Sequence, residues 1–296
     1  MIYTLGCSFT KWFWPTWADW LQEYQGPVTN LAWPGASNET MYWELLNRSD
    51  TITTHDQVYI MLTGNNRVST WYDKEWIEHN DVMGFFPNQD GQLEFGVDKW
   101  RGMYRLHPDH DVSLTEMIIN NFNVIFQMQN LLENIGCNYK FVFWQNPWFD
   151  IRPVIKPNWQ YSWPSKNTLT TVEFNTAQSI LKILPVRKLL CLIKWQNFYL
   201  SPSNVFDPLT YSGMWEYRNK KLKNPEHVKY AHTDPHPDSL IQHDFLTEIM
   251  LNKVDNKIRE NAKRCALNSL LHDIDFSKHA LITDNFSAKW PKFCQI

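Results

Sequence analysis

The first ten residues, "MIYTLGCSFT" (1–10), contain the pattern that decides the fold: a short apolar strand that ends in a glycine and is followed by a serine. Residues 1–5 are apolar, aromatic or β-branched, which predicts a buried strand, and Gly6 ends it. Ser8 then lies at the carboxyl end of a strand, where open α/β sheets bind ligands, so it is a candidate nucleophile. The alternative is a serine that caps the next helix.

Strands and helices alternate along the rest of the chain. We expect strands in "GPVTNLAWPG" (26–35), "QVYIMLTGNN" (57–66), "NYKFVFWQN" (138–146) and, as a fifth, "KLLCLIKW" (188–195). Helices are expected in "PTWADWLQEY" (15–24), "SNETMYWELLNR" (37–48), residues 113–136 and "SLIQHDFLTEIMLNKV" (239–254). This alternation predicts an α/β fold in which helices cover both faces of a parallel five-stranded sheet, a three-layer α/β/α sandwich.

Local signals place the ends of these helices. Ser37 or Asn38 is expected to cap the second helix, and Asp238 or Ser239 the last one. Ser113 and Glu116 form a capping box, with Gly136 at the far end of the same helix. No linker divides the chain. We therefore expect one domain, 1–296, with insertions at about 67–112, 146–180 and 195–235.

Composition excludes several functional classes. The net charge is -3 and 20% of the 296 residues are charged, so no basic surface is available for nucleic acid. No apolar run approaches the roughly 20 residues that cross a bilayer, and no signal peptide is evident, so we expect a soluble, cytoplasmic protein without a membrane partner. The five cysteines are scattered, which favours reduced thiols. The 16 tryptophans exceed the needs of one core, so some are expected to line a cleft or an interface.

Polar residues follow each expected strand, and parallel strands bring them to one edge of the sheet. They are Ser8 after the first strand, Asn30 to Gly35 after the second, Asn65 and Asn66 after the third, and Asp234 and His236 before the last helix. A hydroxyl, an imidazole, a carboxylate, a carboxamide and a glycine amide are the groups that acyl transfer through a covalent intermediate requires.

These blocks, "GCSFT", "NLAWPGAS", "TGNNR" and "DPHP", resemble in order the four main blocks of the SGNH (GDSL-like) hydrolases. The resemblance implies a flavodoxin-like fold, Ser8 as nucleophile and His236 as base. It also implies that Gly35 and Asn66 form the oxyanion hole with the Ser8 amide. The chain departs from the pattern at three places: Cys7 and Arg67 replace aspartates, and Asp234 lies two residues before the histidine, not three.

The two-residue spacing resembles an alginate acetyltransferase-like branch of the superfamily, which leaves hydrolase and transferase open. The Trp-rich chain also resembles phage-encoded members, which implies a phage-encoded or virion protein. We expect Asp234 to orient His236, because Pro235 favours an extended segment in which both side chains project to one side. Cys7, next to a cleft-facing serine, is expected to pack into the core.

Other interpretations of the same residues stay open. Asn66 and Gly35 are common turn residues, and His236 also fits a structural role beside Asp234. "HTDPHPD" (232–238) alternates His and Asp like a metal site, but its prolines exclude the helix that would align residues four apart, so we expect no metal and no cofactor.

The chemistry predicted is hydrolysis of an acyl ester, with O-acetyl groups on a carbohydrate as the expected substrate. Trp144 and Trp148 follow a strand end and are expected to flank the cleft and stack on a sugar ring, with Arg67 nearby. Two alternatives are an O-acyltransferase that uses the same site and a catalytically decayed carbohydrate-binding or structural protein. The oligomeric state, the acyl group and the alcohol are not determined by the sequence.

Overall fold

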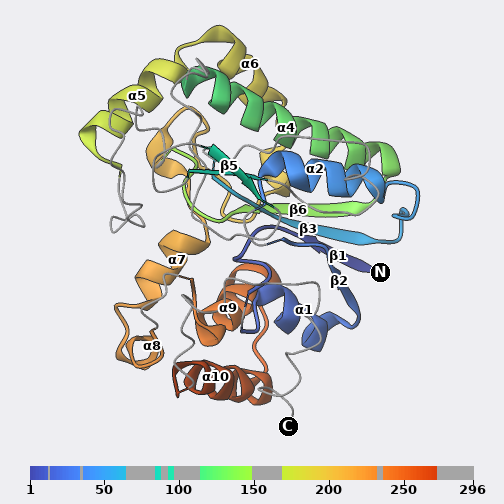
Figure 1. Cartoon of the computed structure of the whole chain (residues 1–296), viewed down its shortest axis with the longest axis vertical. Helices are drawn as coiled ribbons and strands as arrows, with labels where there is room; N and C mark the ends of the chain where they lie inside the picture. The colour runs from blue at the N-terminus through green and yellow to red at the C-terminus, as the bar shows by residue number, and fades with distance from the viewer. Residues whose placement is uncertain are drawn as a thin grey trace.

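The computed structural model describes residues 1–12, 14–33, 36–64, 84–87, 93–96, 114–148, 169–231 and 236–271. Within them, a four-stranded parallel sheet has the strand order β2-β1-β3-β6, and helices lie on both of its faces (Figure 1). The expected α/β fold with a central parallel sheet is confirmed.

The first strand lies inside the sheet. β1 (Ile2–Leu5) pairs with β2 (Val28–Asn30) on one side and with β3 (Gln57–Leu62) on the other, and β3 pairs with β6 (Asn138–Phe143). Every pairing is parallel, so the carboxyl ends of the four strands lie at the same edge. The residues that follow β1, β2 and β3 therefore start from one edge of the sheet.

The expected fifth strand at 188–195 is wrong. Most of this stretch belongs to helix α6 (Leu184–Leu192), in which Val186 and Leu190, four residues apart, are the buried positions. A short apolar run fits a helix face as well as a strand, and here the helical period prevails. Among the described residues, the outer edge of β6 carries two isolated parallel bridges, Phe141 to Phe198 and Phe143 to Gly213.

One face of the sheet is covered by α2 (Asn38–Asn47) and α4 (Leu114–Ile135), which contact each other (Figure 1). Farther out, α6 packs against α4 and α5 (Thr171–Leu181) packs against α6. The expected ends of these helices are confirmed where the structure describes them. Ser37 caps α2 by accepting a hydrogen bond from the Thr40 N–H, and Gly136 follows α4 with a φ of 78°.

The opposite face is covered by α1 (Trp17–Gln25) and α9 (Ser239–Phe245), with α10 (Asn256–Leu271) packed outside α9 (Figure 1). The last predicted helix is thus α9, continued by the π-helical turn η3 (Leu246–Leu251). The other described elements are β4 (Gly84–Pro87), antiparallel to β5 (Leu93–Gly96), η1 (Trp195–Asn197), η2 (Pro208–Thr210), α7 (Met214–Lys221) and α8 (Pro225–Val228). All of them lie in the expected insertions.

The buried apolar side chains of the described residues form one continuous cluster that extends from Ile2 to Ala266. Its largest fully buried members include Trp17, Trp144 and Trp148, and Trp14 is buried as well. Many of the tryptophans are therefore buried in the protein interior and do not line a cleft. None of the described helices is long and apolar enough to cross a membrane.

Gly6 allows the chain to turn sharply after β1. A Cβ atom at this position would lie 2.0 Å from Thr10 Oγ1 and 2.7 Å from Thr10 Cβ, closer than real atoms approach. The Gly6 carbonyl also accepts a hydrogen bond from the Trp33 N–H at 3.1 Å, which ties this turn to the segment after β2. The glycine is required by close packing within the turn that carries Ser8.

We expect Gly6→Ala to lower the free energy of unfolding by about 1–3 kcal/mol, the usual cost of overpacking. Urea denaturation followed by circular dichroism measures the effect. The double variant Gly6→Ala/Thr10→Gly removes the opposing side chain and should recover part of the loss. A Gly6→Ala protein as stable as the wild type would show that the packing of this turn is not tight.

Candidate active site

Ser8 lies in a turn directly after β1. The Cys7 carbonyl accepts hydrogen bonds from the N–H groups of Thr10 (2.9 Å) and Lys11 (3.2 Å), which closes the turn. The Thr10 carbonyl in turn accepts from Asn30 Nδ2 at 3.0 Å, at the end of β2. Ser8 is 3% exposed, and its neighbour Cys7 is fully buried, as expected for a packing residue. The turn therefore presents the hydroxyl and not the thiol to the site.

His236 reaches Ser8 from the far end of the chain. Its Nε2 lies 2.8 Å from Ser8 Oγ, across 228 positions of sequence, and the imidazole is 6% exposed. With Nε2 unprotonated, the Ser8 hydroxyl donates to it, which is the arrangement in which an imidazole removes the proton of an attacking alcohol. The structure thus brings together two of the residues that the sequence predicts for catalysis.

The segment after Ser8 and the segment after His236 are joined by hydrogen bonds. Trp14 Nε1 donates to the Pro237 carbonyl at 2.7 Å, and Ser239 Oγ donates to the Pro15 carbonyl at 3.0 Å. Gln242 spans both segments, since its Nε2 donates to the Phe9 carbonyl (3.3 Å) and its Oε1 accepts from the Trp17 N–H (3.2 Å). These buried bonds fix the turn that contains Ser8 relative to α9.

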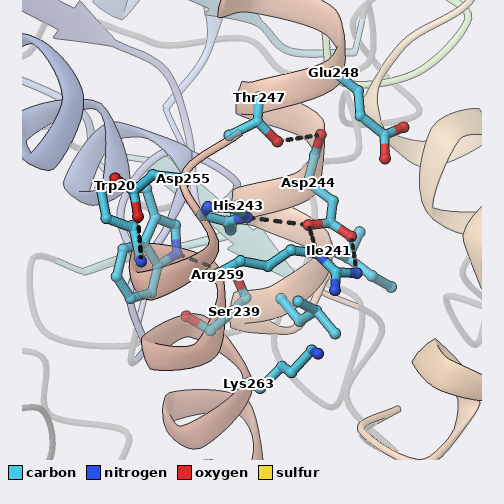
Figure 2. A network of polar contacts seen from close by, with 12 residues as sticks. Trp20, Ser239, Ile241, His243, Asp244, Thr247, Glu248, Asp255, Arg259 and Lys263 are labelled. Atoms are coloured by element: carbon cyan, nitrogen blue, oxygen red, sulfur yellow. Dashed lines mark hydrogen bonds and ion pairs between the residues drawn. The ribbon is translucent and has the colours of Figure 1, made fainter. Parts of the chain in front are cut away.

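A buried polar cluster holds α9 in place on its other side (Figure 2). The Asp244 carboxylate contacts His227 Nε2 and His243 Nδ1, each at 3.0 Å, and accepts two bonds from the Arg259 guanidinium at 2.9 and 3.0 Å. Arg259 also forms a bidentate pair with Glu226. Burial alone would raise the pKa of Asp244, but these partners outweigh it and hold that pKa well below its usual value. The cluster joins α8, α9 and α10 through one carboxylate.

The N-terminus of α9 is capped by Asp238, two residues after His236. Its Oδ1 accepts hydrogen bonds from the N–H groups of Leu240 (2.9 Å) and Ile241 (3.0 Å), as the sequence predicted. Burial raises the pKa of Asp238 to about 6, although those bonds and the charges of His227 and Arg218 act to lower it. The cap therefore carries an ionisable group two residues from His236.

The end of β3 is held by α2. Asn38 Oδ1 accepts from the Thr63 N–H at 2.8 Å, and its Nδ2 donates to the Thr63 carbonyl at 3.2 Å. Thr63 precedes the "GNN" segment that contains Asn66. Asn66, Gly35, Arg67 and Asp234 lie outside the described residues, so their expected roles stay predictions.

The prediction that Trp144 and Trp148 flank the cleft and stack on substrate is wrong. Both indoles are fully buried. Trp144 packs edge-on against Phe9 at 4.9 Å between ring centroids, and Trp148 packs against Phe122 at 5.8 Å and against Tyr211. A position after a strand end is shared by core and cleft residues, and here packing against other aromatic rings buries both indoles.

Several residues that shape the site have no motif in the sequence. Gln242 and Asn38 are polar residues on helix faces, and only their burial shows that they tie neighbouring segments together. Asp244 carries a weak signal, since it directly follows His243 in the last predicted helix. Among the described residues, no group of three or more His, Cys, Asp and Glu side chains could hold a metal ion.

No model of a known protein family matches the chain, and comparison with curated proteins likewise finds no match.

The raised pKa of Asp238 has a consequence for stability. The folded protein binds this proton more tightly than an unfolded chain with a pKa of 3.8. The stabilisation of the fold by this bound proton is complete below pH 3.8 and is lost as the pH rises through about 6. For a shift of this size, the free energy of unfolding falls by about 3 kcal/mol. Asp238→Asn keeps the capping oxygen without the charge. We expect the stability of the wild type to fall relative to Asp238→Asn between pH 4 and 7 in urea titrations.

The matched control is Asp255→Asn, at the exposed start of α10, where the carboxylate accepts from the N–H groups of Lys257 and Ile258. Like Asp238→Asn, this substitution replaces a helix-capping carboxylate by an amide, but at an exposed position. Equal pH dependence in the wild type and in Asp238→Asn would contradict the assignment.

Proposed function

We propose that the protein is a serine esterase of the SGNH (GDSL-like) type that acts on an acyl ester, with an O-acetylated carbohydrate as its substrate class. The observation that carries the proposal is the 2.8 Å contact between Ser8 Oγ and His236 Nε2 at the carboxyl edge of a parallel sheet. The carbohydrate part rests on the resemblance of the four sequence blocks and on the aromatic content of the chain.

The proposed reaction proceeds in two steps. Ser8 Oγ attacks the ester carbonyl carbon while His236 Nε2 accepts the hydroxyl proton, and the imidazolium then protonates the departing alcohol. Water, deprotonated by the same nitrogen, attacks the acyl-Ser8 carbonyl; the bond to Ser8 Oγ then breaks, the imidazolium returns the proton to Oγ, and the acid is released. The Ser8 amide, Gly35 and Asn66 are proposed to bind the oxyanion, and Asp234 to orient the imidazole.

Burial of the dyad favours keeping a second candidate, an O-acyltransferase. Ser8 and His236 are 3% and 6% exposed, so bulk water has little access to them in this structure. A sugar hydroxyl would then replace water in the second step, with no other change in the chemistry. The third alternative, a decayed binding protein, is disfavoured by the hydrogen-bonded Ser8 and His236.

Substitution of the nucleophile tests the proposal. We expect Ser8→Ala to lower kcat on 4-nitrophenyl acetate by at least about 10³-fold, because the covalent step is lost. Cys7→Ala, the matched control at the adjacent buried position, should keep kcat within a few-fold of the wild type. The assay is repeated with added sugar alcohols, and acetylated acceptor formed faster than acetate would identify the transferase.

Wild-type protein without activity on any acyl ester, or Ser8→Ala protein with unchanged kcat, would contradict the proposal. If Cys7→Ala is inactive and Ser8→Ala is active, the nucleophile is the Cys7 thiol and not the Ser8 hydroxyl.

A further inference from the structure

The imidazole of His236 lies flat against the indole of Trp12. The ring centroids are 3.8 Å apart and the planes are inclined by only 23°. Phe9 contacts the same imidazole at 5.1 Å and 49°, which is a tilted contact and not a stack. Trp12 is 6% exposed, so the stack is shielded from water. Of these two contacts, only the one with Trp12 places an aromatic face parallel to the imidazole.

This geometry acts on the imidazole in two ways. A parallel contact on one face resists rotation of the ring out of the plane in which Nε2 faces Ser8 Oγ. The face of an indole also attracts a cation, by about 0.5–1 kcal/mol at exposed sites and by about 2 kcal/mol or more where water is excluded. The proposed reaction makes His236 a cation while the proton of Ser8 is held on Nε2. The stack therefore strengthens at the step where the charge appears.

We propose that Trp12 is a positioning residue for His236, which fixes the plane of the imidazole and stabilises its protonated form. The effect on rate rests on the proposed function. The effect on the imidazole itself does not, because it follows from the stack alone. Since the indole is buried, it stabilises the transition state through His236, and the change should appear in kcat and not in KM.

Other ionisable groups near the imidazole are shared by every variant compared. Cys7 precedes Ser8 in the nucleophile turn, and Asp238 caps α9 two residues after His236. His227 and Arg218 act on Asp238 through their charges. Asp238 also titrates near pH 6, so its contribution is removed by repeating each measurement in the Asp238→Asn background.

The test compares Trp12→Leu, Trp12→Phe and the matched control Phe9→Leu, which removes the tilted ring from the same imidazole. NMR spectra of histidine-labelled protein report the ring protons of His236 as a function of pH, and amide spectra verify folding. In the wild type, the stacked indole should shift these ring protons upfield. In Trp12→Leu that shift should vanish, and half-protonation should occur about 0.7–1.5 pH units lower, the equivalent of about 1–2 kcal/mol.

Kinetics on the acetyl ester supply the second readout. We expect Trp12→Leu to lower kcat about 5-fold to 30-fold with KM within two-fold, as the loss of about 1–2 kcal/mol in the transition state requires. Trp12→Phe should restore most of kcat, and Phe9→Leu should change it less than Trp12→Leu does. If Trp12→Leu does not fold, the ring-proton shifts of His236 in the wild type and in Trp12→Phe test the proposal instead.

Wild-type His236 protons without an upfield shift, or equal titration of His236 in all folded variants, would overturn the proposal. An inactive wild type whose His236 titrates as described would reject the esterase and leave the stack established. An active wild type with equal kcat in Trp12→Leu and Phe9→Leu would reject the role of Trp12 and leave the esterase standing.

Discussion

The buried hydrogen bonds between the segment that follows β1 and the segment that leads into α9 are the constraint on which the site depends. Ser8 and His236 come from opposite ends of the chain, and a 2.8 Å contact between them requires both backbones to be fixed. The bonds from Trp14 to Pro237 and from Ser239 to Pro15 do this without involving either reactive side chain. Gln242 adds a third link by bonding two backbone groups of the nucleophile segment. The scaffold therefore orients the dyad before any substrate arrives.

This arrangement buries polar and charged side chains, which is unfavourable unless each has a hydrogen-bond or ion-pair partner. Asp244 would be unfavourable alone in the core, but two histidines and a bidentate arginine surround it. Removing one partner would leave a buried charge without its counter-charge, which is strongly destabilising. Asp238 is different, because backbone amides and more distant charges offset its burial only in part. One helix thus carries a carboxylate that stays ionised and another that titrates near the site.

The elements with strong local signals could be predicted from the sequence, and those set by long-range contacts could not. β1, β3, β6 and α4 have uniform patterns, and the caps Ser37 and Asp238 have side chains that identify them. Residues 188–195 contain a short apolar run that fits a strand or a helix face, and most of them belong to α6. Ser8 and His236 were predicted because parallel strands bring their ends to one edge. The stacking of Trp12 and the burial of Trp144 depend on contacts between distant segments, which no local pattern records.

The central claim is that His236 activates Ser8, and labelling with a fluorophosphonate probe tests it most directly. The probe reacts with an activated serine hydroxyl and needs no knowledge of the natural substrate. Peptide mass spectrometry should locate a single adduct on Ser8 in the wild type, formed at least about 10³-fold faster than in His236→Ala, because the imidazole removes the proton. An adduct on Cys7, or labelling of Ser8 at the same rate in the wild type and in His236→Ala, would contradict the account.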